Sequence, residues 1–121
     1  MRVRLDHLGL DVRDLGAARD WYTSVLGLEV EFEIADPPVA GLKDGGDFTL
    51  ILRQGPGTGS PCSLFFQVDD VAAAHRELTE RGVEFRSGPQ ANDWGYGAEL
   101  LDPDSRLVGL WDEASMGAHQ S

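Results

Sequence analysis

Two stretches of the chain share one pattern of apolar and polar positions. The first is HLGLDVRDLGAARDWYTSVLGLEV, from His7, and the second is SLFFQVDDVAAAHRELTERGVEF, from Ser63. Each begins with the alternation of a half-buried strand and continues with apolar residues at helical spacing. With one gap near the glycine after the helix, the stretches align throughout, which indicates an internal duplication.

The duplicated helices have matching start and stop signals. Asp14 and Asp70 each precede a helical segment, where a carboxylate accepts the free backbone amides of the first turn. Gly27 and Gly82 follow the two helices and are suited to end them. One apolar stripe on each helix is expected to cover a sheet, formed by Leu15, Ala18, Tyr22 and Val25 in the first helix and by Val71, Ala74 and Leu78 in the second.

Three strand-like runs follow each helix. They are LEVEFEI, VAGLK and DFTLILRQ in the first half, and VEFRS, GAELLD and RLVGLW in the second. The last two runs of each half are joined by turn formers, Asp-Gly-Gly or Asp-Pro-Asp, which predicts a hairpin. The fold class is therefore α+β, with two tandem βαβββ modules forming an open, curved mixed sheet around a cavity.

The chain of 121 residues is predicted to form a single domain. Module one spans about residues 3–54, the Gly/Pro-rich linker GPGTGSP residues 55–61, and module two about residues 62–113. The tail, about residues 114–121, is small and polar, which favours fraying, so neither His119 in it nor His75 in the second helix is expected to be a ligand.

Strand alternation divides the side chains between two faces of each sheet. Because Leu8, Leu10 and Val12 are expected under the helix, His7 faces the other way. The same alternation places a mixture of aromatic, small, polar and charged groups on that face, and such a mixture is typical of a ligand cavity rather than a core. These residues are His7, Thr49, Ile51, Arg53, Ser63, Phe65, Gln67, Gly109 and Trp111, and Trp94 follows in a glycine-containing loop that suits either a flap or an anchor.

The amino-acid composition narrows the classes of partner that the chain can bind. Acidic residues number 21 against 10 basic ones, which gives a net charge of −11. A negative charge disfavours binding to nucleic acid, and it produces a field that attracts cations. No apolar run is long enough to cross a membrane, and the N-terminus lacks a secretory pattern, so a cytoplasmic location is expected. Cys62 is the single cysteine, which excludes an intrachain disulfide.

Together with WGYGAELLDPDSRLVGLW, the repeated stretches resemble the vicinal oxygen chelate superfamily of glyoxalases, extradiol dioxygenases and fosfomycin and bleomycin resistance proteins. The resemblance covers nearly the whole chain. It implies paired βαβββ modules around a cavity and a homodimer, in some members with modules exchanged between chains. The segment GPQANDWGYGAELLDPDSRLVGLW is most similar to the metal-free bleomycin-resistance branch, whose members sequester a cationic drug.

The resemblance also implies four positions that ligate a metal in the enzymes of the superfamily. His7 matches the first position, whereas the other three hold Ile51, Ser63 and Gly109. A catalytic divalent ion needs about three protein ligands, so no metal and no other cofactor is expected. Substitute ligands would have to come from unmatched residues, namely Asp11, Gln67, Asp69 or Glu99.

Three functions fit these residues. The first is a metal-free protein that binds and sequesters an aromatic or cationic small molecule on Phe65, Trp94, Trp111 and their neighbours. The second is an enzyme, either a lyase or dioxygenase with relocated metal ligands or a metal-free catalyst with His7 as acid or base. The third is an assembly domain with a vestigial cavity. The substitutions at the ligand positions favour the first function over an enzyme.

Overall fold

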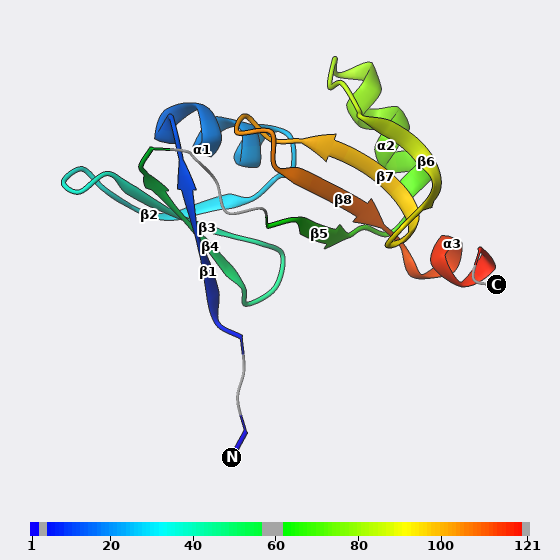
Figure 1. The fold of residues 1–121 in the computed structure, drawn as a ribbon, viewed down its shortest axis with the longest axis horizontal. Helices are drawn as coiled ribbons and strands as arrows, with labels where there is room; N and C mark the ends of the chain where they lie inside the picture. Colours follow the sequence, from blue (N-terminus) through cyan, green and yellow to red (C-terminus); the bar gives the residue numbers. More distant parts are fainter. Residues whose placement is uncertain (3–4, 57–61, 120–121) are drawn as a thin grey trace. The chain divides into compact units, whose positions relative to one another are not determined.

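The computed structural model describes residues 1–2, 5–56 and 62–119 (Figure 1). Residues 57–61 of the predicted linker lie outside this range. The chain divides into two compact units, Met1–Ser60 and Pro61–Ser121, and each is described by itself. No helix among the described residues has the length and apolar character needed to cross a membrane.

Unit one contains β1 (His7–Val12), α1 (Leu15–Ser24), β2 (Glu29–Ile34), β3 (Val39–Lys43) and β4 (Thr49–Gln54). Its four-stranded sheet has the order β1-β4-β3-β2, in which β1 and β4 are parallel and the other neighbours are antiparallel. Helix α1 packs against β3 and β4.

Unit two contains β5 (Leu64–Gln67), α2 (Val71–Glu80), β6 (Ser87–Asn92), β7 (Gly95–Leu101), β8 (Leu107–Trp111) and α3 (Glu113–Ala118). The sheet order, β5-β8-β7-β6, repeats that of unit one, again with one parallel pair, β5 and β8. The predicted α+β class and the duplicated βαβββ modules are confirmed.

The predicted helix caps are confirmed in both units. Asp14 accepts a hydrogen bond from the Ala17 amide, and Asp70 accepts one from the Ala73 amide, each at 3.0 Å. Gly27 and Gly82 follow the helices with φ of 74° and 88°, a conformation that a residue with a Cβ rarely adopts. The helices therefore begin and end at matching places in the repeat.

The hairpin turns of the two units share one hydrogen-bond pattern. In the β3–β4 turn the Asp44 carboxylate accepts from the amides of Gly46 and Phe48. In the β7–β8 turn the Asp102 carboxylate accepts from the amides of Asp104 and Arg106. Each Asp thus organises its own turn through a side chain that mimics a backbone acceptor.

The core of each unit lies between its sheet and its helix. On β1 the residues Leu10 and Val12 are buried, whereas His7, Gly9 and Asp11 are exposed, as the alternation predicted. The helices contribute the buried residues Tyr22, Val71 and Leu78. Other buried residues of the sheets are Leu42, Leu50 and Leu52 in unit one and Leu100, Val108 and Leu110 in unit two.

Two sequence predictions in unit two were wrong. The strand predicted at VEFRS (83–87) begins only at Ser87 and runs to Asn92. Phe85 lies near α2, where its ring contacts His75 edge-on at 4.6 Å. The real strand contains Pro89, which β6 tolerates as the edge strand of its sheet.

The predicted fraying of the tail was wrong as well. Residues 113–118 form α3, and Asp112 at its N-cap accepts the Ser115 amide at 2.6 Å. Contacts of the Met116 sulfur and the His119 ring with β7 hold the helix. The small and polar residues of the tail give no sign of these contacts.

Candidate ligand-binding site

The sheet face opposite α2 contains the predicted aromatic residues of unit two. In the parallel pair, Phe65 lies beside Gly109 and Gln67 beside Trp111, so all four share this face. The partner of Gly109 on β7 is Glu99, which adds a carboxylate. Phe65 keeps 45% of its surface exposed, whereas Trp111 is half-buried.

Trp94 lies on this face and is anchored there. Its ring centroid is 5.0 Å from that of Phe65, at an interplanar angle of 57°. A Cβ at Gly97 would approach the indole to 2.5 Å, and one at Gly109 would approach it to 3.2 Å and the Phe65 ring to 2.6 Å. The two glycines therefore leave the room that the indole fills, and of the two roles open to Trp94 the packing supports the anchor.

A hydrogen bond fixes the orientation of the indole. Trp94 Nε1 donates to Glu99 Oε2 at 2.8 Å, and the other carboxylate oxygen lies 3.8 Å from Nε of Arg86. The Glu99 side chain is only 14% exposed, while that of Arg86 is 59% exposed. Phe65, Trp94 and Glu99 thus form an aromatic surface with a carboxylate at its edge, which we call the Trp94 platform.

The polar residues predicted for this face lie around the platform rather than in it. Ser63 is exposed and precedes β5, so it is not part of the strand. Gln67 is exposed at the end of β5. The structure therefore brings together Phe65, Trp94 and Gly109 among the predicted residues, with Gln67 and Trp111 further along the same strands and Ser63 just before β5.

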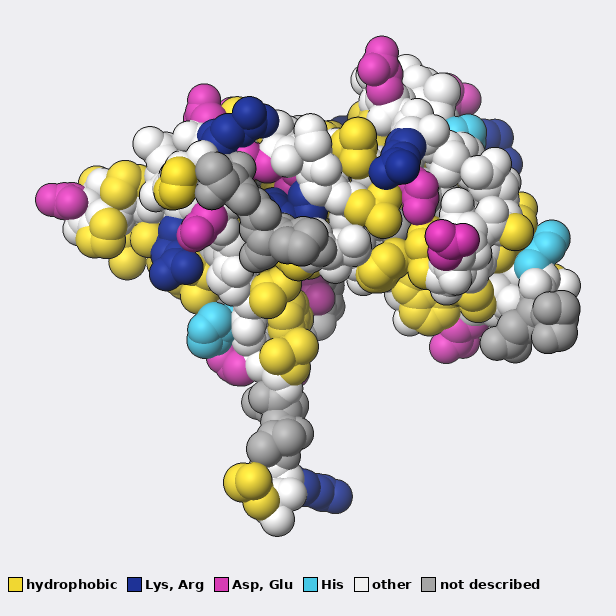
Figure 2. Space-filling view, in the orientation of Figure 1, with side chains coloured by type: hydrophobic (Ala, Val, Ile, Leu, Met, Phe, Trp, Pro, Cys, Tyr) yellow, Lys and Arg dark blue, Asp and Glu magenta, His cyan; other side chains and the backbone are white. Residues whose placement is uncertain are grey.

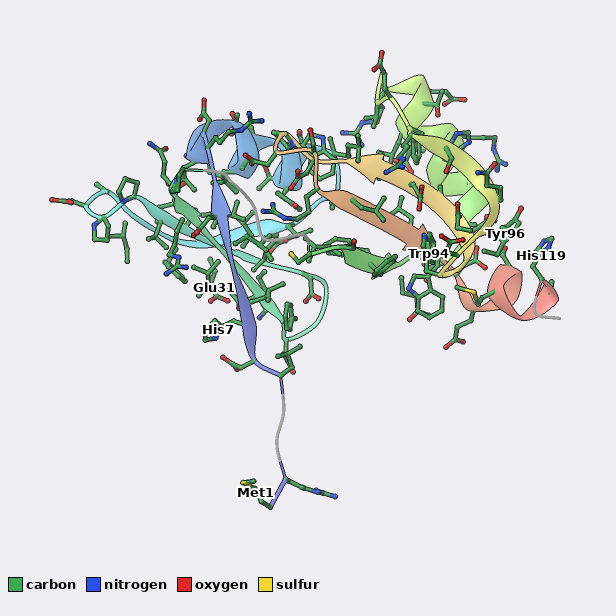
Figure 3. The ribbon with its side chains drawn as sticks, in the orientation of Figure 1. Met1, His7, Glu31, Trp94, Tyr96 and His119 are labelled. Carbon is green, nitrogen blue, oxygen red and sulfur yellow. The ribbon has the colours of Figure 1, made fainter. Side chains whose placement is uncertain are left out.

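The face opposite α1 is built differently. His7 pairs in register with Thr49 and its Nδ1 lies 3.1 Å from Asp6 Oδ2, with the imidazole 53% exposed (Figure 3). Next along the strands, Gly9 is beside Ile51, and Arg53 forms an ion pair with Asp11 at 3.3 Å. Arg53 thus has an acidic partner within its own sheet.

Sequence reasoning missed two contributors on these faces. Phe32 on β2 covers Gly41, where a Cβ would collide with the ring, and Gly97 makes the corresponding room for Trp94. Glycine inside a strand often marks such a close approach, so Gly41 and Gly97 were the available signal.

The fold and this site define a small duplicated βαβββ protein with an aromatic surface on one sheet. A family model for the Glyoxalase/Bleomycin resistance protein/Dioxygenase superfamily matches residues 4–109. The chain belongs to this superfamily, which confirms the resemblance seen in its sequence.

Solved structures and a protein from Bacillus subtilis are similar to this chain. TnmS3, an antibiotic binding protein from Streptomyces sp. CB03234, is 26% identical, with a TM-score of 0.76 over 92% of this chain and 96% of that one. A glyoxalase/bleomycin resistance protein from the same source is 28% identical, with a TM-score of 0.66 over 86% and 96%. YwbC of Bacillus subtilis (strain 168), an uncharacterized protein, is 28% identical over 70% of this chain and 76% of its own length.

The residues at the superfamily's metal positions do not fit a divalent ion. Ile51 has no donor atom, and a ligating side chain at Gly109 would collide with Phe65 and Trp94. In the described ranges, no three His, Cys, Asp or Glu side chains lie together as a metal site would require. Two of the possible substitute ligands have other partners: Asp11 forms an ion pair with Arg53, and Glu99 accepts a hydrogen bond from the Trp94 indole.

Proposed function

We propose that this protein binds and sequesters a planar aromatic compound, with a preference for cations, without a metal and without chemical conversion. The observation that carries the proposal is the Trp94 indole, fixed over two glycines beside the exposed ring of Phe65. A rigid aromatic surface gains stacking energy with little loss of conformational freedom, so it favours a flat ligand.

The proposed preference for cations rests on one local charge, that of Glu99, and on the net charge of the whole chain. Glu99 places a largely buried carboxylate at the edge of the platform, and a cation over an aromatic face is attracted by the ring itself. The net charge of −11 adds a long-range attraction. Acidic side chains are spread over the face in view in Figure 2, so the long-range field favours cations in general and the platform provides the selectivity.

The side chains near the platform argue for binding over catalysis. Glu99 is engaged by Trp94 and lies close to Arg86, an arrangement that holds an indole in place. His7, the candidate acid or base, is in the other unit, exposed and paired with the adjacent Asp6. The antibiotic-binding TnmS3 provides a precedent for binding within this fold.

A charge series of tricyclic compounds tests the proposal. Proflavine (cationic), acridone (neutral) and anthraquinone-2-sulfonate (anionic), together with bleomycin, are titrated by isothermal calorimetry in buffer containing EDTA. We expect saturable binding in the order cation, neutral, anion, and recovery of each compound unchanged by chromatography. Absence of binding for all four compounds, dependence on an added divalent ion, or conversion of a compound would contradict the proposal. Sedimentation velocity of the same preparation tests the predicted homodimer.

A further inference from the structure

The short C-terminal helix α3 holds the backbone that carries the Trp94 platform. Sδ of Met116 accepts a hydrogen bond from the Tyr96 amide at 3.2 Å, and a Cβ on Gly95 would lie only 2.5 Å from this sulfur. At the end of the helix, the His119 ring stacks on the Tyr96 ring, with centroids 3.8 Å apart and planes 5° from parallel (Figure 3). Both contacts fall on the two residues directly after Trp94.

The backbone between these contacts and Trp94 is short and lies in a closed bend. Gly95, the single residue between Trp94 and Tyr96, has φ of 132°, a conformation that only glycine adopts readily. Across the hairpin, Nδ2 of Asn92 donates to the carbonyls of Gln90 and Gly97. Because glycine itself is conformationally permissive, the contacts of Met116 and His119 with residues 95–96 hold the chain beside Trp94 in this conformation.

We propose that Met116 and His119 are positioning residues for Trp94, and that α3 thereby sets the affinity of the platform for its ligand. This inference rests on the proposed function where it concerns affinity. It assigns a role to a helix that lies beyond residues 4–109, the part matched by the family model. Neither residue is on the platform itself, so both act through the backbone of residues 95–96.

The position of Trp94 can be measured without a ligand. The indole N–H of Trp94 is hydrogen-bonded to Glu99 and gives a ¹H–¹⁵N cross-peak that Trp94→Phe assigns by its loss. Met116→Ala and His119→Ala are expected to move this cross-peak. His119→Phe, which keeps a stacked ring, restores its position, and Glu113→Gln, an exposed change on the same helix, leaves it in place. An unmoved Trp94 cross-peak in both alanine variants would overturn the inference.

The affinity is measured with proflavine in the same variants. We expect the Kd to rise about three- to tenfold in Met116→Ala and His119→Ala, with recovery in His119→Phe. If the wild-type protein binds neither proflavine nor the other compounds, the proposed function fails while the cross-peaks still decide the positioning role. If it binds proflavine and the alanine variants bind equally well, the effect on affinity is refuted and the proposed function stands.

Discussion

The two units use the same hydrogen bond to hold their helix and differ in the charge of the acceptor. In unit one, Oε1 of Gln54 accepts the amide of Leu15, the first residue of α1, at 3.1 Å. In unit two, Asp112 occupies the repeat-equivalent position and accepts the amide of Val71, the first residue of α2. Bonds that hold each helix to the end of its sheet were thus kept in both halves of the repeat.

The opposite faces of the sheets diverged instead. Unit one has an Asp11–Arg53 ion pair and the Phe32 ring over Gly41, whereas unit two has the Trp94 platform. Because the repeat retains the bonds that hold each helix, we expect a role specific to one unit on the faces that differ. We therefore expect ligand binding in unit two, and the substitutions below compare the two units from the largest expected effect to the smallest.

The largest expected difference concerns the two turn aspartates. Asp102 forms a 2.8 Å ion pair with Arg106, and both side chains are almost fully buried, at 0% and 4% exposed. Asp102→Ala leaves a buried guanidinium without this partner, so the free energy of unfolding should fall by about 3–5 kcal/mol. Asp44→Ala loses only turn hydrogen bonds and should cost about 1 kcal/mol. Urea unfolding followed by circular dichroism measures both, and equal losses would contradict the account.

The second difference is in acid sensitivity. A hydrogen bond from the Val71 amide is the largest cause of the lowered pKa of Asp112, with further bonds from Ser115, while burial acts in the opposite direction. A lowered folded-state pKa stabilises the protein above the unfolded value of about 3.9, and this contribution is lost as the pH falls through the folded-state pKa.

Asp112→Ala should therefore cost about 2–3 kcal/mol at pH 7, with a difference from wild type that shrinks at acid pH. Gln54→Ala removes a neutral acceptor, so its smaller cost should not change with pH. Thermal or urea unfolding of both variants between pH 7 and the acid limit of the folded state provides the measurement. A constant Asp112→Ala difference across that range would show that the carboxylate charge is unimportant.

The third difference concerns binding. Trp94→Ala should weaken proflavine binding about 10- to 100-fold, because it removes the stacking surface, while Trp94→Phe, which keeps an aromatic ring but loses the larger indole and its bond to Glu99, should have an intermediate effect. Phe32→Ala, the matched aromatic change in unit one, should alter the Kd by less than about twofold. Calorimetric titration compares the three, and a greater loss in Phe32→Ala than in Trp94→Ala would place binding in unit one.

The smallest expected effect is that of His7→Ala. The imidazole is exposed, its ring nitrogen is near Asp6, and it belongs to unit one. Proflavine affinity should remain within about twofold of wild type. If His7→Ala abolished binding, or abolished a turnover found in the compound screen, His7 would be a residue of the functional site.

Much of the fold could be predicted from the sequence because its signals are local and appear twice. Asp14 and Asp70 start helices, Gly27 and Gly82 end them, and strand alternation assigns the faces. Strand β6 was misplaced because Val83 and Phe85 alternate like residues of a strand. Phe85 instead contacts His75 of α2, and the real edge strand contains Pro89.

The site was harder to predict because it depends on individual side-chain contacts, which strand alternation does not show. Alternation alone placed Phe65 and Gly109 on one face, but the position of Trp94 depends on Glu99 and on the room left at Gly97. Helix α3 was missed for a similar reason. Its contacts with Gly95 and Tyr96 come from a sulfur atom and a ring twenty or more residues away, which no local pattern shows.

The central claim is that the Trp94 platform binds a planar ligand without a metal. Its most direct test is a titration of the ¹⁵N-labelled protein with proflavine in EDTA, followed through the indole N–H cross-peaks of its three tryptophans. We expect the Trp94 cross-peak to shift most and to saturate with the calorimetric Kd, while that of Trp21 on α1 stays in place. A saturated complex in which the Trp94 cross-peak has not moved would contradict it.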